Sequence, residues 1–114
     1  MRESYEYAKV RESFGKPIVQ HQAVTLRLAD IAVNSEAAKV YTESTLAQPF
    51  WTDARACIAG VRHLGELSNK AVKDALQVAG AHGYVEGLPF KRLYERTRSL
   101  TAVFEASMCP AVEE

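Results

Sequence analysis

The chain has few cysteines, no excess of either charge and no long apolar run. Its two cysteines, Cys57 and Cys109, lie far apart without metal-ligand spacing, so we expect reduced thiols and no disulfide framework. The 14 basic residues balance the 14 acidic ones, which excludes the strong field that draws proteins to nucleic acid or an anionic membrane. No apolar run reaches the length of a bilayer span, and Met1-Arg2-Glu3-Ser4 does not open a signal peptide. We therefore expect a cytoplasmic protein.

Several common catalytic and binding patterns are also absent. The sequence has no Walker phosphate loop, no serine-nucleophile elbow and no basic strip interleaved with aromatic residues. None of the three histidines has a second ligand at metal spacing, so no metal site is expected. We interpret His21 as structural and His63 as a surface or partly buried residue of a helix. His82 is interpreted as a solvated loop residue, with phosphate contact as the alternative.

Apolar residues recur at helical spacing along the chain, and no stretch alternates with the period of two that strands require. Glycines and prolines divide the pattern into helices expected at residues 4–13, 20–46 and 53–79, with a fourth that opens at Leu88-Pro89. The 114 residues make at most one domain. Two long helices flanked by two shorter ones predict an all-α fold, an antiparallel up-down four-helix bundle.

The ends of these helices carry further expectations. Gln48-Pro49-Phe50-Trp51 breaks the second helix, and Thr52 or Asp53 is expected to cap the third. Alanine and glycine in the third helix should let neighbouring helices approach closely, although Gly60 and Gly65 weaken the expectation that it is uninterrupted. The first helix begins so near the start that it is interpreted as cut from a longer segment, and the acidic tail after Pro110 is expected to be loose.

Two turns carry residues suited to a charged ligand. The first is Arg11-Glu12-Ser13-Phe14-Gly15, followed by Gln22, in which an arginine can hold phosphate and an aromatic ring can pack against a cofactor. The second is Gln77-Val78-Ala79-Gly80-Ala81-His82-Gly83-Tyr84, whose glycines leave backbone open to a ligand. Taken alone, each turn is more simply a helix cap.

Taken together, the two turns resemble the carboxy-terminal helical domain of the acyl-CoA dehydrogenase family. The resemblance is carried by Arg11-x-x-Phe14-Gly15 with Gln22, by Gln77-x-x-Gly80-x-x-Gly83-Tyr84, by Leu28-Ala29-Asp30 and by Tyr94-Glu95-Arg96. It covers the chain from Tyr7 to about Glu105. Two motifs at the right separation are more specific than either alone, so we interpret both turns as ligand-binding.

The resemblance implies a flavoprotein domain that packs against its twin in a dimer, two dimers making a tetramer. It implies that Arg11, Phe14 and Gln22 reach the pyrophosphate and adenine side of FAD held by the neighbouring subunit. Gln77 and Gly80 would approach the adenosine-diphosphate part. We expect the two bends to lie at opposite ends of the bundle and to meet across a pair of chains.

The reaction implied by the resemblance is α,β-dehydrogenation of acyl-CoA thioesters in fatty acid metabolism. The amino-terminal helical domain and β-barrel of such enzymes are absent from residues 1–114, so dehydrogenation by this chain alone is not expected. We expect a homo-oligomer, or a heteromer with the missing domains, that binds neither nucleic acid nor membrane.

Three departures from the family pattern bear on function. Ala81 stands where a second adjacent glycine is usual, and Glu95-Arg96-Thr97 does not reproduce an arginine-aspartate pair. Glu105 is the only candidate for the base that removes the substrate's α-proton, but it comes one residue later than expected and precedes alanine. A solvated glutamate is its alternative. The departures motivate a second function, a non-catalytic dimerisation or scaffold module that has lost flavin.

Overall fold

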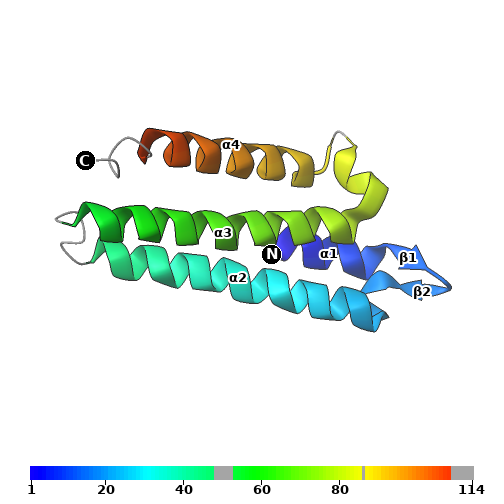
Figure 1. The fold of residues 1–114 in the computed structure, drawn as a ribbon. Helices are drawn as coiled ribbons and strands as arrows, with labels where there is room; N and C mark the ends of the chain where they lie inside the picture. The colour runs from blue at the N-terminus through cyan, green and yellow to red at the C-terminus, as the bar shows by residue number, and fades with distance from the viewer. Residues whose placement is uncertain (48–52, 86, 109–114) are drawn as a thin grey trace.

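A computed structural model describes residues 1–47, 53–85 and 87–108 as an up-and-down bundle of helices (Figure 1). Its elements are α1 (Arg2–Val10), β1 (Glu12–Ser13), β2 (Lys16–Pro17), η1 (Ile18–Gln20), α2 (Gln22–Leu46), α3 (Ala54–Ala79), η3 (Gly80–Tyr84) and α4 (Phe90–Met108). The predicted all-α four-helix fold is confirmed. The expected break at residues 48–51, the alternative cap at Thr52, Cys109 and the tail after Pro110 lie outside the described residues.

The helix bounds differ from prediction mainly at the first helix. α1 ends at Val10 because the residues after Arg11 form a short antiparallel hairpin, in which Glu12 lies opposite Pro17. This hairpin corrects the expectation that no strand would form. At the start of α3, the Asp53 carboxylate accepts hydrogen bonds from the amides of Arg55 and Ala56, at 2.9 and 3.3 Å. Asp53, one of the two caps that the sequence offered, therefore caps α3.

α3 is the central helix, and both α2 and α4 pack against it (Figure 1). It runs uninterrupted through Gly60 and Gly65, both of which are buried. A Cβ at Gly65 would lie 2.8 Å from Thr101 Cγ2, so the missing side chain lets α4 approach α3 closely. Gly65 therefore serves helix packing, and the expected interruption of α3 does not occur.

The core is concentrated at the end of the bundle that holds α1. One cluster joins α1, α2 and α3 through Ala8, Leu28, Ile31 and Val78. A second joins the end of α3 to the start of α4 through Leu76, Ala79 and Phe90. Arg27 and Asp74, 2.9 Å apart, add an ion pair between α2 and α3. This end is therefore a packed platform for the two connections beside it.

The bundle as a whole is elongated, with extents of 59 × 25 × 20 Å. Its radius of gyration is 16.8 Å, whereas a compact domain of this length would have about 13 Å. Large apolar side chains remain exposed on α4, at Leu93, Leu100, Val103 and Phe104. Among the described residues, no helix combines the length and the apolar character needed to cross a bilayer.

Candidate functional site

Both connections that carry the predicted motifs lie at the same end of the bundle (Figure 1). One joins α1 to α2 through the hairpin, and the other joins α3 to α4 through η3. In an up-and-down chain, the first and third connections share an end. The expectation that the two bends lie at opposite ends was therefore wrong, because they meet within one chain.

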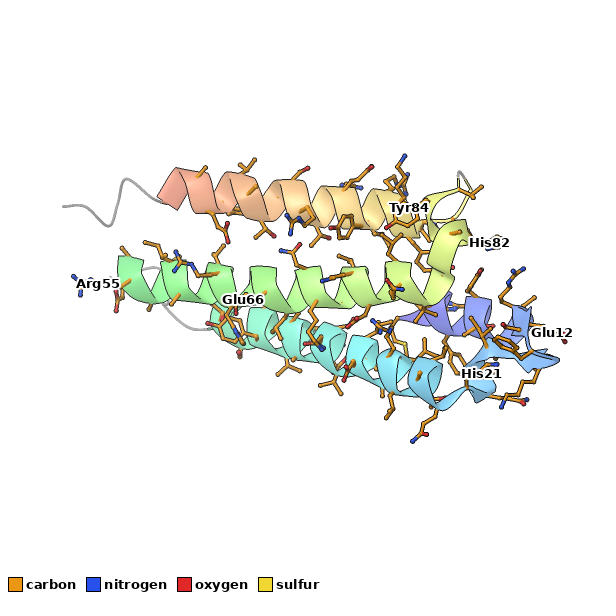
Figure 2. The ribbon with its side chains drawn as sticks, turned by 45° about the vertical axis from the view of Figure 1, so that its right-hand side comes forward. Glu12, His21, Arg55, Glu66, His82 and Tyr84 are labelled. Atoms are coloured by element: carbon orange, nitrogen blue, oxygen red, sulfur yellow. The ribbon has the colours of Figure 1, made fainter. Side chains whose placement is uncertain are left out.

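A surface cavity lies where the two connections meet, and we call it the Arg11 cavity. It has a volume of about 410 Å³ and is lined by Tyr7, Val10, Arg11, Glu12 and His82. The Tyr7 hydroxyl donates a hydrogen bond to the Ala79 carbonyl oxygen at 3.2 Å, which ties α1 to the end of α3. Figure 2 shows Glu12 and His82 at this end of the molecule. The fold therefore brings Arg11 beside the glycine-containing turn.

Arg11 is the residue at which the chain leaves α1. Its backbone is extended, its amide donates to the Tyr7 carbonyl at 2.9 Å, and its carbonyl accepts from the Ile18 amide at 2.8 Å. The side chain is exposed, and no carboxylate of the described residues lies within ion-pair distance of it. The guanidinium therefore has its fork of donors available for an anionic ligand.

Lys9, close to Arg11 in sequence, is engaged on the outer surface of α1. Its ammonium nitrogen lies 2.8 Å from the Glu6 carboxylate and 5.1 Å from the centroid of the Tyr5 ring. The hydrogen bond to Glu6 raises the pKa of Lys9 above its ordinary value. Lys9 thus stays charged and paired, and Arg11 is the permanent cation among the residues that line the cavity.

The hairpin after Arg11 is closed by a turn that suits phenylalanine poorly. Phe14 and Gly15, the two residues between the paired Ser13 and Lys16, have φ angles of 52° and 78°. Two positive φ angles mark a type I′ turn, where a residue with a Cβ is less stable than glycine by about 1–2 kcal/mol. The Phe14 side chain is nevertheless 96 % exposed. An aromatic ring that strains its backbone and joins no core points to a functional role.

His21 supports this turn from the start of α2. Its Nε2 lies 3.0 Å from the Ser13 carbonyl oxygen and donates to it, because a carbonyl can only accept. The His21 ring also lies edge-on to the Phe14 ring, with 6.2 Å between centroids. These contacts agree with the structural role predicted for His21. Gln22, the next residue, is exposed at the first position of α2.

Gly80 ends α3 with a conformation that L-residues rarely adopt, φ 58° and ψ −140°. Its amide donates to the carbonyl oxygens of Leu76 and Gln77, and no atom lies within 4 Å of the place where a Cβ would stand. The backbone there is open to a ligand. Gly83 serves a different purpose, because a Cβ there would lie 2.9 Å from Leu76 Cδ1 and prevent η3 from packing on α3.

The predicted glutamine of α3 lies on the outside of the helix. Gln77 is exposed, whereas its neighbours Leu76 and Val78 are buried. Of the predicted cofactor residues, Arg11 lines the cavity, while Phe14, Gln22, Gln77 and Gly80 surround this end of the bundle without lining it. The fold thus gathers all five at one end and only one of them into the cavity itself.

Glu105, the predicted catalytic base, lies elsewhere. It is exposed and sits inside α4, not in a turn after that helix. Counted from Phe90, a helix rise of 1.5 Å per residue puts it roughly 22 Å along α4 from the end that holds the Arg11 cavity. Exposed Val103 and Phe104 precede it. A single copy of the chain does not bring Glu105 to the other predicted site residues.

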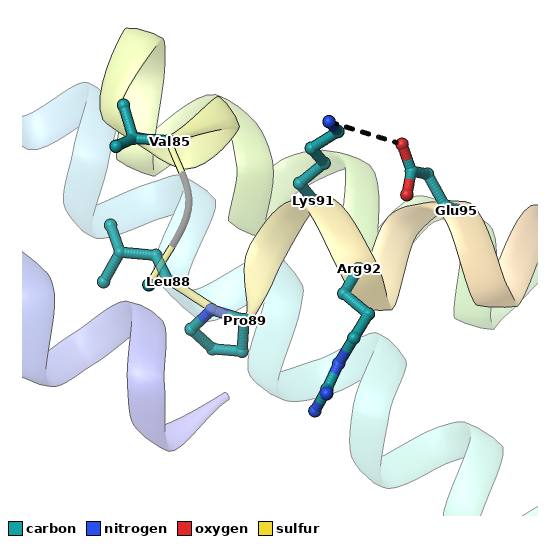
Figure 3. Close-up of a pocket in the computed structure, with 7 residues that line it drawn as sticks. Val85, Leu88, Pro89, Lys91, Arg92 and Glu95 are labelled. Atoms are coloured by element: carbon teal, nitrogen blue, oxygen red, sulfur yellow. Dashed lines mark ion pairs between the residues drawn. The ribbon is translucent and has the colours of Figure 1, made fainter.

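Two other cavities lie beside α4 (Figure 3 shows the first). The first, of about 400 Å³, is lined by Val85, Gly87, Leu88, Pro89, Lys91, Arg92 and Glu95. There Lys91 pairs with Glu95 at 4.0 Å, and Arg92 projects in a different direction from Lys91. The second, of about 330 Å³, lies between α3 and α4 and has a mainly apolar lining that includes Leu64, Leu100 and Phe104. Neither is formed by both connections that carry the predicted motifs, whereas the Arg11 cavity joins Arg11 to the turn that holds His82.

The remaining polar candidates do not form a site of their own. His63 is exposed and lies edge-on to Tyr41, with 5.4 Å between ring centroids. Cys57 is a free, partly buried thiol. Within residues 1–47, 53–85 and 87–108, no three histidine, cysteine, aspartate or glutamate side chains gather as a metal-binding group.

Reasoning from the sequence missed Tyr7 as a site residue and interpreted His82, which is exposed, as a solvated loop residue with phosphate contact as the alternative. Both line the Arg11 cavity, and the two rings are tilted by 47° with 6.5 Å between centroids. The signal that could have found them is the order of connections, since an up-and-down bundle puts the turn after its first helix beside the turn after its third.

Comparison with known proteins agrees with the all-α fold and with the family that the sequence resembles. Residues 1–104 match the family described as acyl-CoA dehydrogenase, C-terminal domain. The chain is 30% identical over 109 residues to an acyl-CoA dehydrogenase of Bacillus subtilis (strain 168), a match that covers 94% of this chain and 28% of that protein.

Two further relatives are named for activities other than acyl-CoA dehydrogenation. A 3-sulfinopropanoyl-CoA desulfinase of Paraburkholderia xenovorans (strain LB400) is 37% identical over 101 residues, covering 84% of this chain and 25% of that protein. A subunit of the caffeyl-CoA reductase-Etf complex of Acetobacterium woodii is 32% identical over 101 residues. This match covers 87% of this chain and 27% of that protein. The chain thus spans about a quarter of the length of these relatives. By its match to the family's C-terminal domain over nearly its whole length, this chain belongs to the acyl-CoA dehydrogenase family.

Proposed function

We propose that this segment contacts FAD and helps to assemble an acyl-CoA dehydrogenase-type flavoprotein. The observation that carries the proposal is the meeting of Arg11 with the glycine-containing turn at one end of the bundle. Arg11 has an available guanidinium, Gly80 leaves backbone open, and Phe14 presents an exposed ring. These features suit a dinucleotide, because its pyrophosphate is anionic and its ring systems are flat.

Each predicted residue has a role that matches its chemistry. Arg11 binds the pyrophosphate, Phe14 packs against the adenine side, and the open backbone at Gly80 lets the adenosine-diphosphate part approach. The amides of Gln22 and Gln77 can donate and accept hydrogen bonds at the edges of the same ligand. FAD, when bound, supplies the acceptor for the hydride that leaves the β-carbon of the substrate.

Glu105 is proposed as the group that takes the α-proton of an acyl-CoA thioester. Because it lies far along α4 from the Arg11 cavity, the two roles require a site completed by another chain or by further domains. The names of these relatives share a CoA thioester and differ in reaction, so acyl-CoA is the substrate class that we propose. A cytoplasmic location and a part in fatty acid metabolism remain predictions.

Assembly is the second part of the proposal. The elongated bundle leaves Leu93, Leu100, Val103 and Phe104 of α4 exposed, and burying such side chains against another chain is favourable. We therefore propose that the chain works as a homo-oligomer or together with the remaining domains of the enzyme.

A scaffold module without flavin is the alternative. It is favoured by the position of Glu105, which is exposed within α4 and away from the other site residues, and by Ala81 in place of glycine. Such a module would use the same exposed apolar side chains for association and would leave Arg11 solvated.

Visible absorbance of the protein, purified in its native assembly, separates the two functions. A yellow protein that releases FAD on denaturation supports the flavoprotein. A colourless oligomer that takes up no added FAD overturns it and supports the scaffold module.

A further inference from the structure

We propose that His82 is a second phosphate-contacting group beside Arg11 and makes FAD retention depend on pH. The inference rests on the proposed function, because it takes the Arg11 cavity to receive the pyrophosphate of a dinucleotide. It goes beyond that function by assigning a role to a residue of the turn that is neither its glutamine nor one of its glycines.

The geometry places the His82 ring on an anchored turn. His82 lines the Arg11 cavity together with Arg11, although the two residues come from different connections (Figure 2 shows His82 on η3). Its carbonyl accepts a hydrogen bond from the Val85 amide at 3.1 Å, and the next residue, Gly83, is buried against α3. The exposed imidazole carries an N–H group that can donate to a phosphate oxygen.

The charges around His82 explain why its protonation state matters. The groups that face it across the cavity are the Tyr7 phenol, the Arg11 guanidinium and the Glu12 carboxylate. The last four residues of α3 (76–79) carry no ionisable side chain, and the cations at the start of α4 line a separate cavity.

With neutral His82, Arg11 and Glu12 cancel, and the cavity has no net formal charge. An imidazolium at this position would give the cavity a net positive charge. An anionic pyrophosphate is therefore bound more tightly when His82 is charged. FAD retention should fall as pH rises, because imidazole loses its proton across the neutral range.

The test is the FAD dissociation constant of the flavin-stripped protein in its native assembly, from about pH 6 to about pH 8.5. FAD is the right probe because each phosphorus of its pyrophosphate has a single, strongly acidic ionisable oxygen, so the charge of the phosphates stays constant across this range. Wild-type protein should bind FAD about three- to fivefold more weakly at the highest pH than at the lowest. This change in affinity is the one expected for the loss of an exposed ion pair. Riboflavin, which has no phosphate, should show no such slope.

Two variants isolate His82. His82→Gln keeps a hydrogen-bond donor without a titrating charge. Its FAD dissociation constant should not change with pH and should equal the larger, high-pH value of the wild type. His82→Lys keeps a cation throughout the pH range. Its FAD dissociation constant should not change with pH and should lie near the smaller, low-pH value of the wild type. Because the side chain is exposed, neither change disturbs the core.

The outcomes separate the inference from the proposed function. A wild-type slope that persists in His82→Gln overturns the role of His82, and if Arg11→Gln still loses FAD the proposed function stands without it. Equal FAD binding by wild type and Arg11→Gln at every pH, or no FAD binding by the wild type, overturns the proposed function and the inference together.

Discussion

The Tyr7 hydroxyl donates a hydrogen bond to the carbonyl oxygen of Ala79 at 3.2 Å, across 72 residues of sequence. The bond joins α1, one turn before Arg11, to the last residue of α3, directly before Gly80. The Tyr7 ring also lies edge-on to Phe90 at the start of α4, with 6.1 Å between centroids. One side chain thus holds the two connections that carry the predicted motifs beside each other.

Tyr7→Phe should lower the free energy of unfolding by about 1 kcal/mol, since it removes one partly buried hydrogen bond and keeps the ring against Phe90. Urea denaturation measures the change. Tyr5→Phe is the matched control, because Tyr5 is 42% exposed on the same helix, and its variant should unfold like the wild type. Equal stability of all three proteins would contradict the role given to the Tyr7 hydroxyl.

Phe14 should lower the stability of the fold and raise the retention of the cofactor. Phe14→Asn and Phe14→Ala both remove the exposed ring, but only asparagine tolerates the first position of a type I′ turn. The asparagine variant should therefore be more stable than the alanine variant by about 1 kcal/mol, measured by thermal or urea unfolding. Both variants should retain less flavin than the wild type. Wild-type flavin content in both variants would show that the Phe14 ring is not a cofactor contact.

The contact of α4 with α3 at Gly65 can be tested by rescue. Gly65→Ala should be destabilising because its Cβ would lie 2.8 Å from Thr101 Cγ2. Thr101→Ser removes that methyl group and keeps the hydroxyl that donates to the Thr97 carbonyl. In the Thr101→Ser protein, the same Gly65→Ala change should stabilise the fold by up to about 1 kcal/mol, through the higher helix propensity of alanine. A loss of equal size in both proteins would show that Thr101 is not the obstacle.

Glu105→Gln should abolish turnover of an acyl-CoA substrate in the complete assembly and leave flavin bound, because it removes a base without touching the Arg11 cavity. Steady-state turnover and flavin absorbance measure the two effects separately. Glu95→Gln is the control on the same helix, and it should keep turnover. Activity retained by Glu105→Gln would remove Glu105 as the base and favour the scaffold alternative.

The four helices could be predicted well because the spacing of apolar residues and the glycines and prolines at helix ends are local signals. The Asp53 cap was predicted for the same reason. The hairpin was missed because its paired stretches, Glu12–Ser13 and Lys16–Pro17, are too short for an alternating pattern.

The composition of the candidate site depended on non-local contacts. The motifs named Arg11, but the place of His82 beside it follows from the Tyr7–Ala79 hydrogen bond and from the packing of Gly83 on Leu76. No local pattern contains either contact. The distance of Glu105 from the Arg11 cavity likewise follows from α4 continuing as a helix through that residue.

The most direct measurement is the FAD content of Arg11→Gln in the native assembly, compared with Arg55→Gln. Both arginines are exposed, but Arg55 lies at the other end of the bundle (Figure 2). Loss of a charge-assisted contact to pyrophosphate should weaken FAD binding by about tenfold or more in Arg11→Gln, while Arg55→Gln keeps the wild-type FAD content. Equal FAD content in the two variants and the wild type would contradict the assignment of the Arg11 cavity as a dinucleotide site.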